Sequence, residues 1–120
     1  MALSKSTKTE IIEDESIALS ATSALSDPID TDNAVSLTLQ ITATWGSSTD
    51  GLLITLYGSE DSNSANAGPM NFSVPITNGT QNVCASVPHG PRYIWVTVTN
   101  LSAEYGVTGV CVWEQRQVLT

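Results

Sequence analysis

The chain has 120 residues, of which 13% are charged, and its formal net charge is −8 at neutral pH. Only four residues are basic, so the sequence lacks the basic patch that nucleic-acid binding requires, and an anionic membrane surface is disfavoured for the same reason. Ser, Thr and β-branched residues outnumber the helix formers, which is typical of strands and turns in a single small domain.

Residues 1–25 are predicted to form an N-terminal arm, and residues 26–120 the folded domain. The arm starts without the apolar core of a signal peptide, so we expect the chain to fold in the cytoplasm where it is made. It is polar and contains Glu13-Asp14-Glu15, which favours a flexible or partner-ordered segment. Four aliphatic residues could add a short strand to a sheet of this subunit or another, and we assign them to a protein interface: Ile11, Ile12, Ile17 and Leu19.

The first clear strand covers residues 35–45, where apolar residues alternate strictly with Ser, Thr and Gln. A turn ending in Asp50-Gly51 follows, and residues 52–57 are predicted to return as the second strand of a hairpin. Residues 72–76 alternate again. Because Pro75 cannot donate a backbone hydrogen bond, that strand is expected at a sheet edge or with a bulge.

The second half continues with strand and turn patterns. Asn78-Gly79 is a two-residue hairpin signal before a strand at 83–87. Strands follow within residues 91–100 and from 107 to about 119, and Gly109 in the second indicates a bulge or close packing. Seven to eight strands without a helix predict an antiparallel β-sandwich of the jelly-roll or immunoglobulin-like kind. Such a small domain buries only about 60–65% of its unfolded surface, so oligomerisation would add stability.

The strand at 93–100 has two faces that could both be buried. Ile94, Val96 and Val98 share one face, and the other carries aromatic rings. We interpret the aliphatic face as core. Because Tyr and Trp anchor interfaces, a protein-contact role is predicted for four aromatic residues: Tyr57, Tyr93, Trp95 and Trp113. The alternative, with the aromatic face inward, stays open because parity alone does not fix which face is buried.

No catalytic residue is assigned, and the chain is predicted not to be an enzyme. A Ser-His-Asp arrangement would need His89, the only histidine, which lies in the turn Pro88-His89-Gly90-Pro91. The acid pairs within Glu13-Asp14-Glu15 and Glu60-Asp61 are adjacent in sequence, unlike glycosidase carboxylates that face each other across a cleft.

No metal or other cofactor is predicted either. Asp27, Asp30, Asp32 and Asn33 offer oxygen ligands of the kind that Ca²⁺ prefers, but their spacing does not match an EF-hand loop, and both residue types are common in turns. Cys84 and Cys111 are too few for a disulfide framework and lack metal-site spacing. We expect both to be free thiols; they could form a disulfide only if their strands are neighbours.

The order of these segments resembles a group of small β-sandwich virion proteins of tailed bacteriophages. The resemblance rests on the strand at 35–42, on Leu53–Asp61, on Phe72-Ser73-Val74-Pro75 and above all on Pro91–Leu101. In that group, Y-x-S-x-D ends one strand and P-R-Y-I-x-V-x-V-T-N forms a later one. The match covers about residues 34–113 and leaves the arm unassigned. One departure is Gly58-Ser59-Glu60-Asp61, which lacks the Pro-Asp turn of the group.

The resemblance implies a non-enzymatic virion component. A capsid decoration (cement) protein is the leading hypothesis, acting as a homo-oligomer, with a trimer favoured, that binds the major capsid protein or another virion protein. Two alternatives stay open. One is a neck, tail or fibre accessory that binds carbohydrate through Tyr93, Trp95 or Trp113. The other is a hydrolase that depends on His89.

Overall fold

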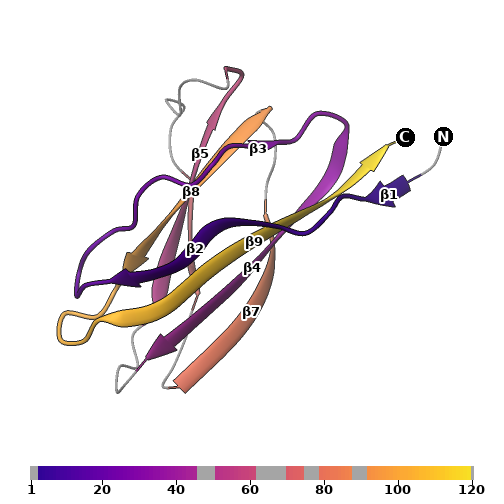
Figure 1. Cartoon of the computed structure of the whole chain (residues 1–120). Helices are drawn as coiled ribbons and strands as arrows, with labels where there is room; N and C mark the ends of the chain where they lie inside the picture. Colours follow the sequence, from indigo (N-terminus) through magenta and orange to yellow (C-terminus); the bar gives the residue numbers. More distant parts are fainter. Residues whose placement is uncertain (1–2, 46–50, 62–69, 75–78, 88–91, 120) are drawn as a thin grey trace.

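The computed structural model describes residues 3–45, 51–61, 70–74, 79–87 and 92–119. Within these ranges the protein is an all-β sandwich, in which antiparallel sheets pack face to face (Figure 1). The described residues contain no helix that could cross a bilayer. The strands are β1 (Leu3–Lys5), β2 (Thr9–Ile17), β3 (Ile29–Asp30), β4 (Ala34–Trp45), β5 (Leu52–Ser59), β6 (Met70–Val74), β7 (Gly79–Val87), β8 (Tyr93–Asn100) and β9 (Val107–Leu119).

The five-stranded sheet is built around β4 and β9. Its order is β1-β9-β4-β7, and β2 also pairs with β9. The N-terminal segment therefore follows β9, because β1 pairs with residues 117–119 and β2 with residues 107–114. The pairing of β2 with β9 contains several register shifts. The strands β4 and β7 pair without a shift, from Leu37 opposite Val87 to Trp45 opposite Gly79.

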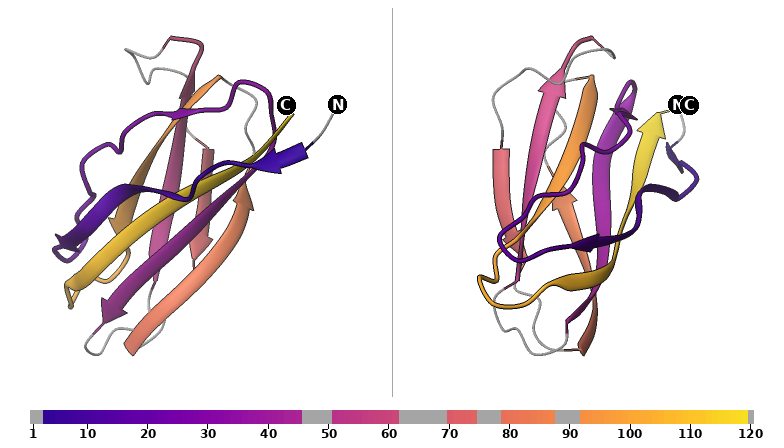
Figure 2. Two further views of the ribbon diagram at one scale, coloured as in Figure 1. Left: turned by 45° about the vertical axis from the view of Figure 1, so that its right-hand side comes forward. Right: turned by 60° about the vertical axis from the view of Figure 1, so that its left-hand side comes forward.

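The four-stranded sheet has the order β3-β8-β5-β6 and lies opposite the first (Figure 2). Its central strands, β5 and β8, pair in regular register, from Leu52 opposite Asn100 to Ser59 opposite Tyr93. The strand β6 lies at the sheet edge, which confirms the position predicted from Pro75. Pro75 itself lies outside the described residues.

The core consists of the inward-facing residues of both sheets, because alternate residues of a strand point to opposite faces. In β8 these are Ile94, Val96 and Val98, each no more than 1% exposed. The aliphatic face of this strand is therefore the core face, and the aromatic-inward alternative is wrong. The other fully buried large side chains of the core are Leu37, Leu39, Ile41, Leu52, Ile54, Leu56, Val107 and Val110.

The segment between β2 and β4 covers the edge of β8. Beyond the short strand β3, backbone N–H groups of Ser23 and Ser26 donate to the carbonyls of Val98 and Val96, and the two serine hydroxyls accept the amides of these same residues at 2.9 Å. A stretch of turn formers thus satisfies the backbone of an edge strand, which would otherwise expose unpaired groups.

A buried amide joins three chain segments at one end of the sandwich. Asn100 is completely buried, and its Nδ2 donates to the carbonyls of Ile17 and Ala18 at 3.2 Å and of Tyr105 at 2.9 Å. Its Oδ1 accepts the Ser102 N–H at 2.9 Å. This side chain therefore holds the end of β2 against the β8–β9 loop.

Two predicted hairpins are wrong. The strands β4 and β5 do not pair: β4 pairs with β7 and β9, whereas β5 pairs with β6 and β8. Likewise β6 and β7, on either side of the Asn78-Gly79 signal, belong to different sheets. In both places the chain crosses between sheets, which places apolar faces opposite each other across the core.

The predicted bulge near Gly109 is confirmed. The register between β4 and β9 changes after the pair of Thr42 with Cys111, since the next pair is Thr44 with Thr108. Gly109 lies on β9 between these pairs and has a φ of 60°. Only glycine adopts this left-handed conformation without a steric cost.

Candidate functional site

The outward side of the five-stranded sheet carries a continuous row of polar side chains. The register places Ser36 opposite Gln117, Thr38 opposite Gln115, and Gln40 opposite Trp113. All six are partly exposed, because the residues between them on β4 point into the core. We call this surface the β4–β9 face; with the lysines described below it consists of Lys5, Lys8, Ser36, Thr38, Gln40, Trp113, Gln115 and Gln117.

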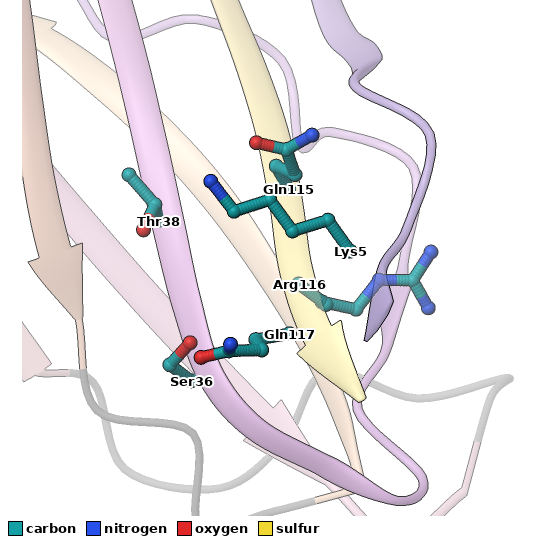
Figure 3. Close-up of a pocket in the computed structure, with 6 residues that line it drawn as sticks. All are labelled: Lys5, Ser36, Thr38, Gln115, Arg116 and Gln117. Carbon is teal, nitrogen blue, oxygen red and sulfur yellow. The ribbon is translucent and has the colours of Figure 1, made fainter. Parts of the chain in front are cut away.

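One end of the β4–β9 face is hollowed into a groove of about 310 Å³. Lys5, Ser36, Thr38, Gln115 and Gln117 surround it, and Lys5 extends across β9 toward Thr38 (Figure 3). Arg116 also lines the groove, but its guanidinium points away. That group instead donates to Glu114 Oε2 from Nε at 3.0 Å and to the Asp30 carbonyl from Nη1. Among the described residues, the groove is therefore lined by hydroxyls, amides and the Lys5 ammonium.

A second hollow of about 90 Å³ continues the first, since Thr38 and Gln115 line both. It is lined further along by Lys8, Gln40, Cys84, Trp113 and Glu114. The Lys8 Nζ lies 4.7 Å from the centre of the Trp113 ring, a distance at which a cation is attracted to an aromatic face. Together the two hollows form one open surface, and Trp113 lies in the smaller of them.

The short connection between β1 and β2 positions both lysines. Ser6 N–H donates to the Arg116 carbonyl at 2.8 Å, and Ser6 Oγ accepts the Arg116 N–H at 2.9 Å. Gln115 Nε2 also donates to the Ser6 carbonyl at 3.1 Å. Because Ser6 is fixed to β9 in this way, Lys5 and Lys8 on either side of it project over the sheet.

The β4–β9 face carries lysine side chains in an otherwise acidic protein. Both lysines of the chain lie on it, although Asp and Glu total 12 against four Lys and Arg. Opposite charges attract over several ångströms at a protein surface. The two ammonium groups can therefore attract carboxylates of a partner, while Glu10, which pairs with Trp113, adds one negative charge beside them.

Beneath this face lies a buried ion pair. Glu114 is only 3% exposed and accepts the bond from Arg116. Burial raises the pKa of the Glu114 carboxyl above its ordinary value, although Arg116 and Thr9 oppose this effect. Glu114 therefore fixes Arg116 toward β3 and leaves the groove to the lysines.

The aromatic residues of the four-stranded sheet form a packed cluster on its outward side. Tyr57 lies opposite Trp95 in the register, and the Tyr93 and Trp95 ring centres are 6.3 Å apart. Trp95 is only 5% exposed, whereas Tyr57 and Tyr93 are half-buried. Arg92 covers Tyr93 at 5.1 Å. Of this group, the tyrosines alone offer surface to a partner.

The predicted arm residues lie on the sandwich. Ile11, Ile12 and Ile17 belong to β2 and are no more than 8% exposed in the core of this same chain. The structure thus shows strand addition within one subunit, which leaves these three side chains no free surface. Leu19, just after β2, is 52% exposed.

The acidic loop at residues 27–33 binds a guanidinium. Asp30 Oδ1 accepts the Asp32 N–H at 3.0 Å and lies 3.4 Å from Arg92 Nε. The Asp32 N–H and Arg92 lower the pKa of the Asp30 carboxyl, although burial opposes them. Within the described ranges, no group of three or more His, Cys, Asp or Glu could hold a metal ion.

The two cysteines are free thiols, as expected. Their strands, β7 and β9, are separated by β4, so the condition for a bridge is not met. His89 lies outside the described residues. Comparisons with protein-family models, with curated proteins and with solved structures find no match to this chain.

Proposed function

We propose that this protein is a non-enzymatic structural component of a tailed-bacteriophage virion, in the first place a capsid decoration protein. The resemblance of residues 34–113 supports the phage context, and the all-β sandwich is the fold that this resemblance implies. The protein would be made in the host cytoplasm and would act as a homo-oligomer, for which the resemblance favours a trimer. Its partner would be the major capsid protein or another virion protein.

The observation that carries a binding role is the Lys8–Trp113 contact on an open polar face. A partly exposed tryptophan supplies contact area, and the surrounding amides and hydroxyls supply hydrogen bonds. Binding at a decoration site would be mechanical, since each copy adds interface area that resists pressure from packaged DNA. A standard interface buries about 1,200–2,000 Å², and the lysines favour an acidic patch on the capsid.

The first experiment asks whether the protein belongs to the particle. Virions from the lysate of a host carrying the gene are banded by density and analysed by mass spectrometry. We expect the protein in the particle band at a copy number near that of the capsid protein. Its absence from purified particles would end the proposal.

A second experiment tests the face itself. Lys8→Gln is compared with Arg92→Gln, which removes the same charge from the four-stranded sheet. Loss of up to about 1 kcal/mol of ionic attraction between Lys8 and the partner weakens particle binding about fivefold for Lys8→Gln only. If the two variants bind equally well, the virion role stands but the β4–β9 face is not the contact.

A second candidate function is carbohydrate binding on a fibre or neck. Gln40, Gln115 and Thr38 surround the Trp113 ring as hydrogen-bonding groups surround a stacked sugar. The Lys8 ammonium, however, occupies a face of that ring, which favours the decoration role. Sugar-induced changes in tryptophan fluorescence that Trp113→Ala abolishes, together with hits on a glycan array, would reverse this preference.

A further inference from the structure

The sheet edges of this protein are protected unequally. On the five-stranded sheet, β1 and β2 cover the outer edge of β9. On the four-stranded sheet, β3 and the serines at 23 and 26 cover β8, and the remaining edge strand β6 has only five residues. The other edge is β7, with nine residues. No strand of the described ranges pairs with the outer side of β7 (Figure 2).

The strand β7 also lacks the features that usually prevent edge pairing. Its sequence, GTQNVCASV, contains no proline and no charged residue. Its pairing with β4 continues over all nine residues without a bulge. Exposed edges are normally interrupted by a charge, a proline, a bulge or a cover, and a long regular edge is a template for another strand.

The distribution of charge favours a second copy as the occupant. Neither β4 nor β7 contains an Asp, Glu, Lys or Arg, whereas β2 at the opposite side of the sheet contains four acids. With strands about 4.8 Å apart, the β2 strands of two copies joined at β7 would be roughly 34 Å apart. That separation is several Debye lengths at physiological salt, about 8 Å each. Two copies of a protein with a charge of −8 can therefore meet at this edge with little repulsion.

We propose that β7 pairs antiparallel with β7 of a second copy across a two-fold axis, which joins the two five-stranded sheets into one. Identical strands in antiparallel orientation satisfy each other's outward backbone groups. A two-fold contact closes after two copies, so the free protein is a dimer and not the trimer that the resemblance favours. This inference does not depend on the virion role.

The test is the mass of the free protein, by native mass spectrometry and sedimentation velocity, for wild type and two variants. Asn82→Lys adds a charge to β7 at the position that pairs with Thr42. The control Ser16→Lys adds the same charge to an exposed position of β2. We expect a dimer that Asn82→Lys converts to a monomer with an unchanged circular dichroism spectrum, and that Ser16→Lys leaves intact.

A monomeric or trimeric wild type, or a dimer that Asn82→Lys does not weaken, would overturn the proposal. If Asn82→Lys does not fold, hydrogen exchange of the wild-type protein tests the same contact without a variant. Peptides covering residues 79–87 should lose protection on dilution, while those covering residues 70–74 of β6 should not change. Equal behaviour of the two strands would contradict a β7 contact.

Discussion

Asn100→Ala should destabilise the fold more than any surface substitution, because Asn100 has no exposed surface and makes four hydrogen bonds. The alanine variant leaves three carbonyls and the Ser102 N–H without their partner. At about 1 kcal/mol for each buried hydrogen bond, the loss amounts to roughly 3–4 kcal/mol. That is a large part of the roughly 5–15 kcal/mol that stabilises a small domain.

Asn100→Asp keeps the shape but replaces the donor group with an oxygen. A carboxylate would then face the carbonyls of Ile17, Ala18 and Tyr105, and burial would raise its pKa. Because the folded state would bind the proton more tightly than the unfolded chain, this variant should lose stability as pH rises above about 4. At neutral pH it should be less stable than the alanine variant.

The assay is urea and thermal unfolding followed by circular dichroism. For a domain of this size, a loss of 3–4 kcal/mol lowers the melting temperature by roughly 15 °C. The matched control is Thr99→Ala, which removes one exposed hydrogen bond of 2.8 Å to Thr22 and should cost under about 1 kcal/mol. A loss below about 1 kcal/mol for Asn100→Ala, or an Asn100→Asp variant insensitive to pH, would refute the reasoning.

Three further substitutions test other buried or strained positions. Burial raises the pKa of Glu114 above its ordinary 4.5, so the wild type should lose stability as pH rises from 4.5 through the raised pKa. Glu114→Gln should remove this pH dependence of the unfolding free energy in urea. Parallel pH profiles of stability for the wild type and the variant would contradict the prediction. Thr97 Oγ1 is buried without a hydrogen-bond partner within the described ranges, so Thr97→Val should gain roughly 1 kcal/mol, and a loss would count against this reading. Gly109→Ala should cost roughly 1 kcal/mol because of its φ of 60°, whereas Gly106→Ala should be nearly neutral in the same melting experiment.

The strands could be predicted closely from the sequence, but their partners could not. Alternation over residues 35–45 predicted β4 to within one residue, and the strand at 107–119 is β9 as expected. A period of two fixes which face of a strand is buried but carries no information about which strand lies beside it. The turn at Asp50-Gly51 therefore suggested a hairpin, although the adjoining strands lie in different sheets.

The candidate site was only partly visible in the sequence. Trp113 was predicted from the sequence as a contact residue, and the structure places it on the outward face between Val112 and Glu114, which are buried. The contribution of Lys5 and Lys8 depends on Ser6 pairing with Arg116, a contact between distant parts of the chain that local pattern does not predict. Trp95 shows that the face of a strand does not by itself predict exposure, since this residue lies on the outward face yet is only 5% exposed.

The pairing of β1 and β2 with β9 has a consequence for synthesis on the ribosome. The strand β9 is the partner of β1, β2 and one side of β4. Until β9 leaves the exit tunnel, β2 has no partner strand and its apolar side chains stay exposed. The five-stranded sheet therefore forms only after β9 has left the exit tunnel, and such distant pairing is intrinsically slow. A nascent chain of this protein should need a chaperone most in the interval before β9 emerges.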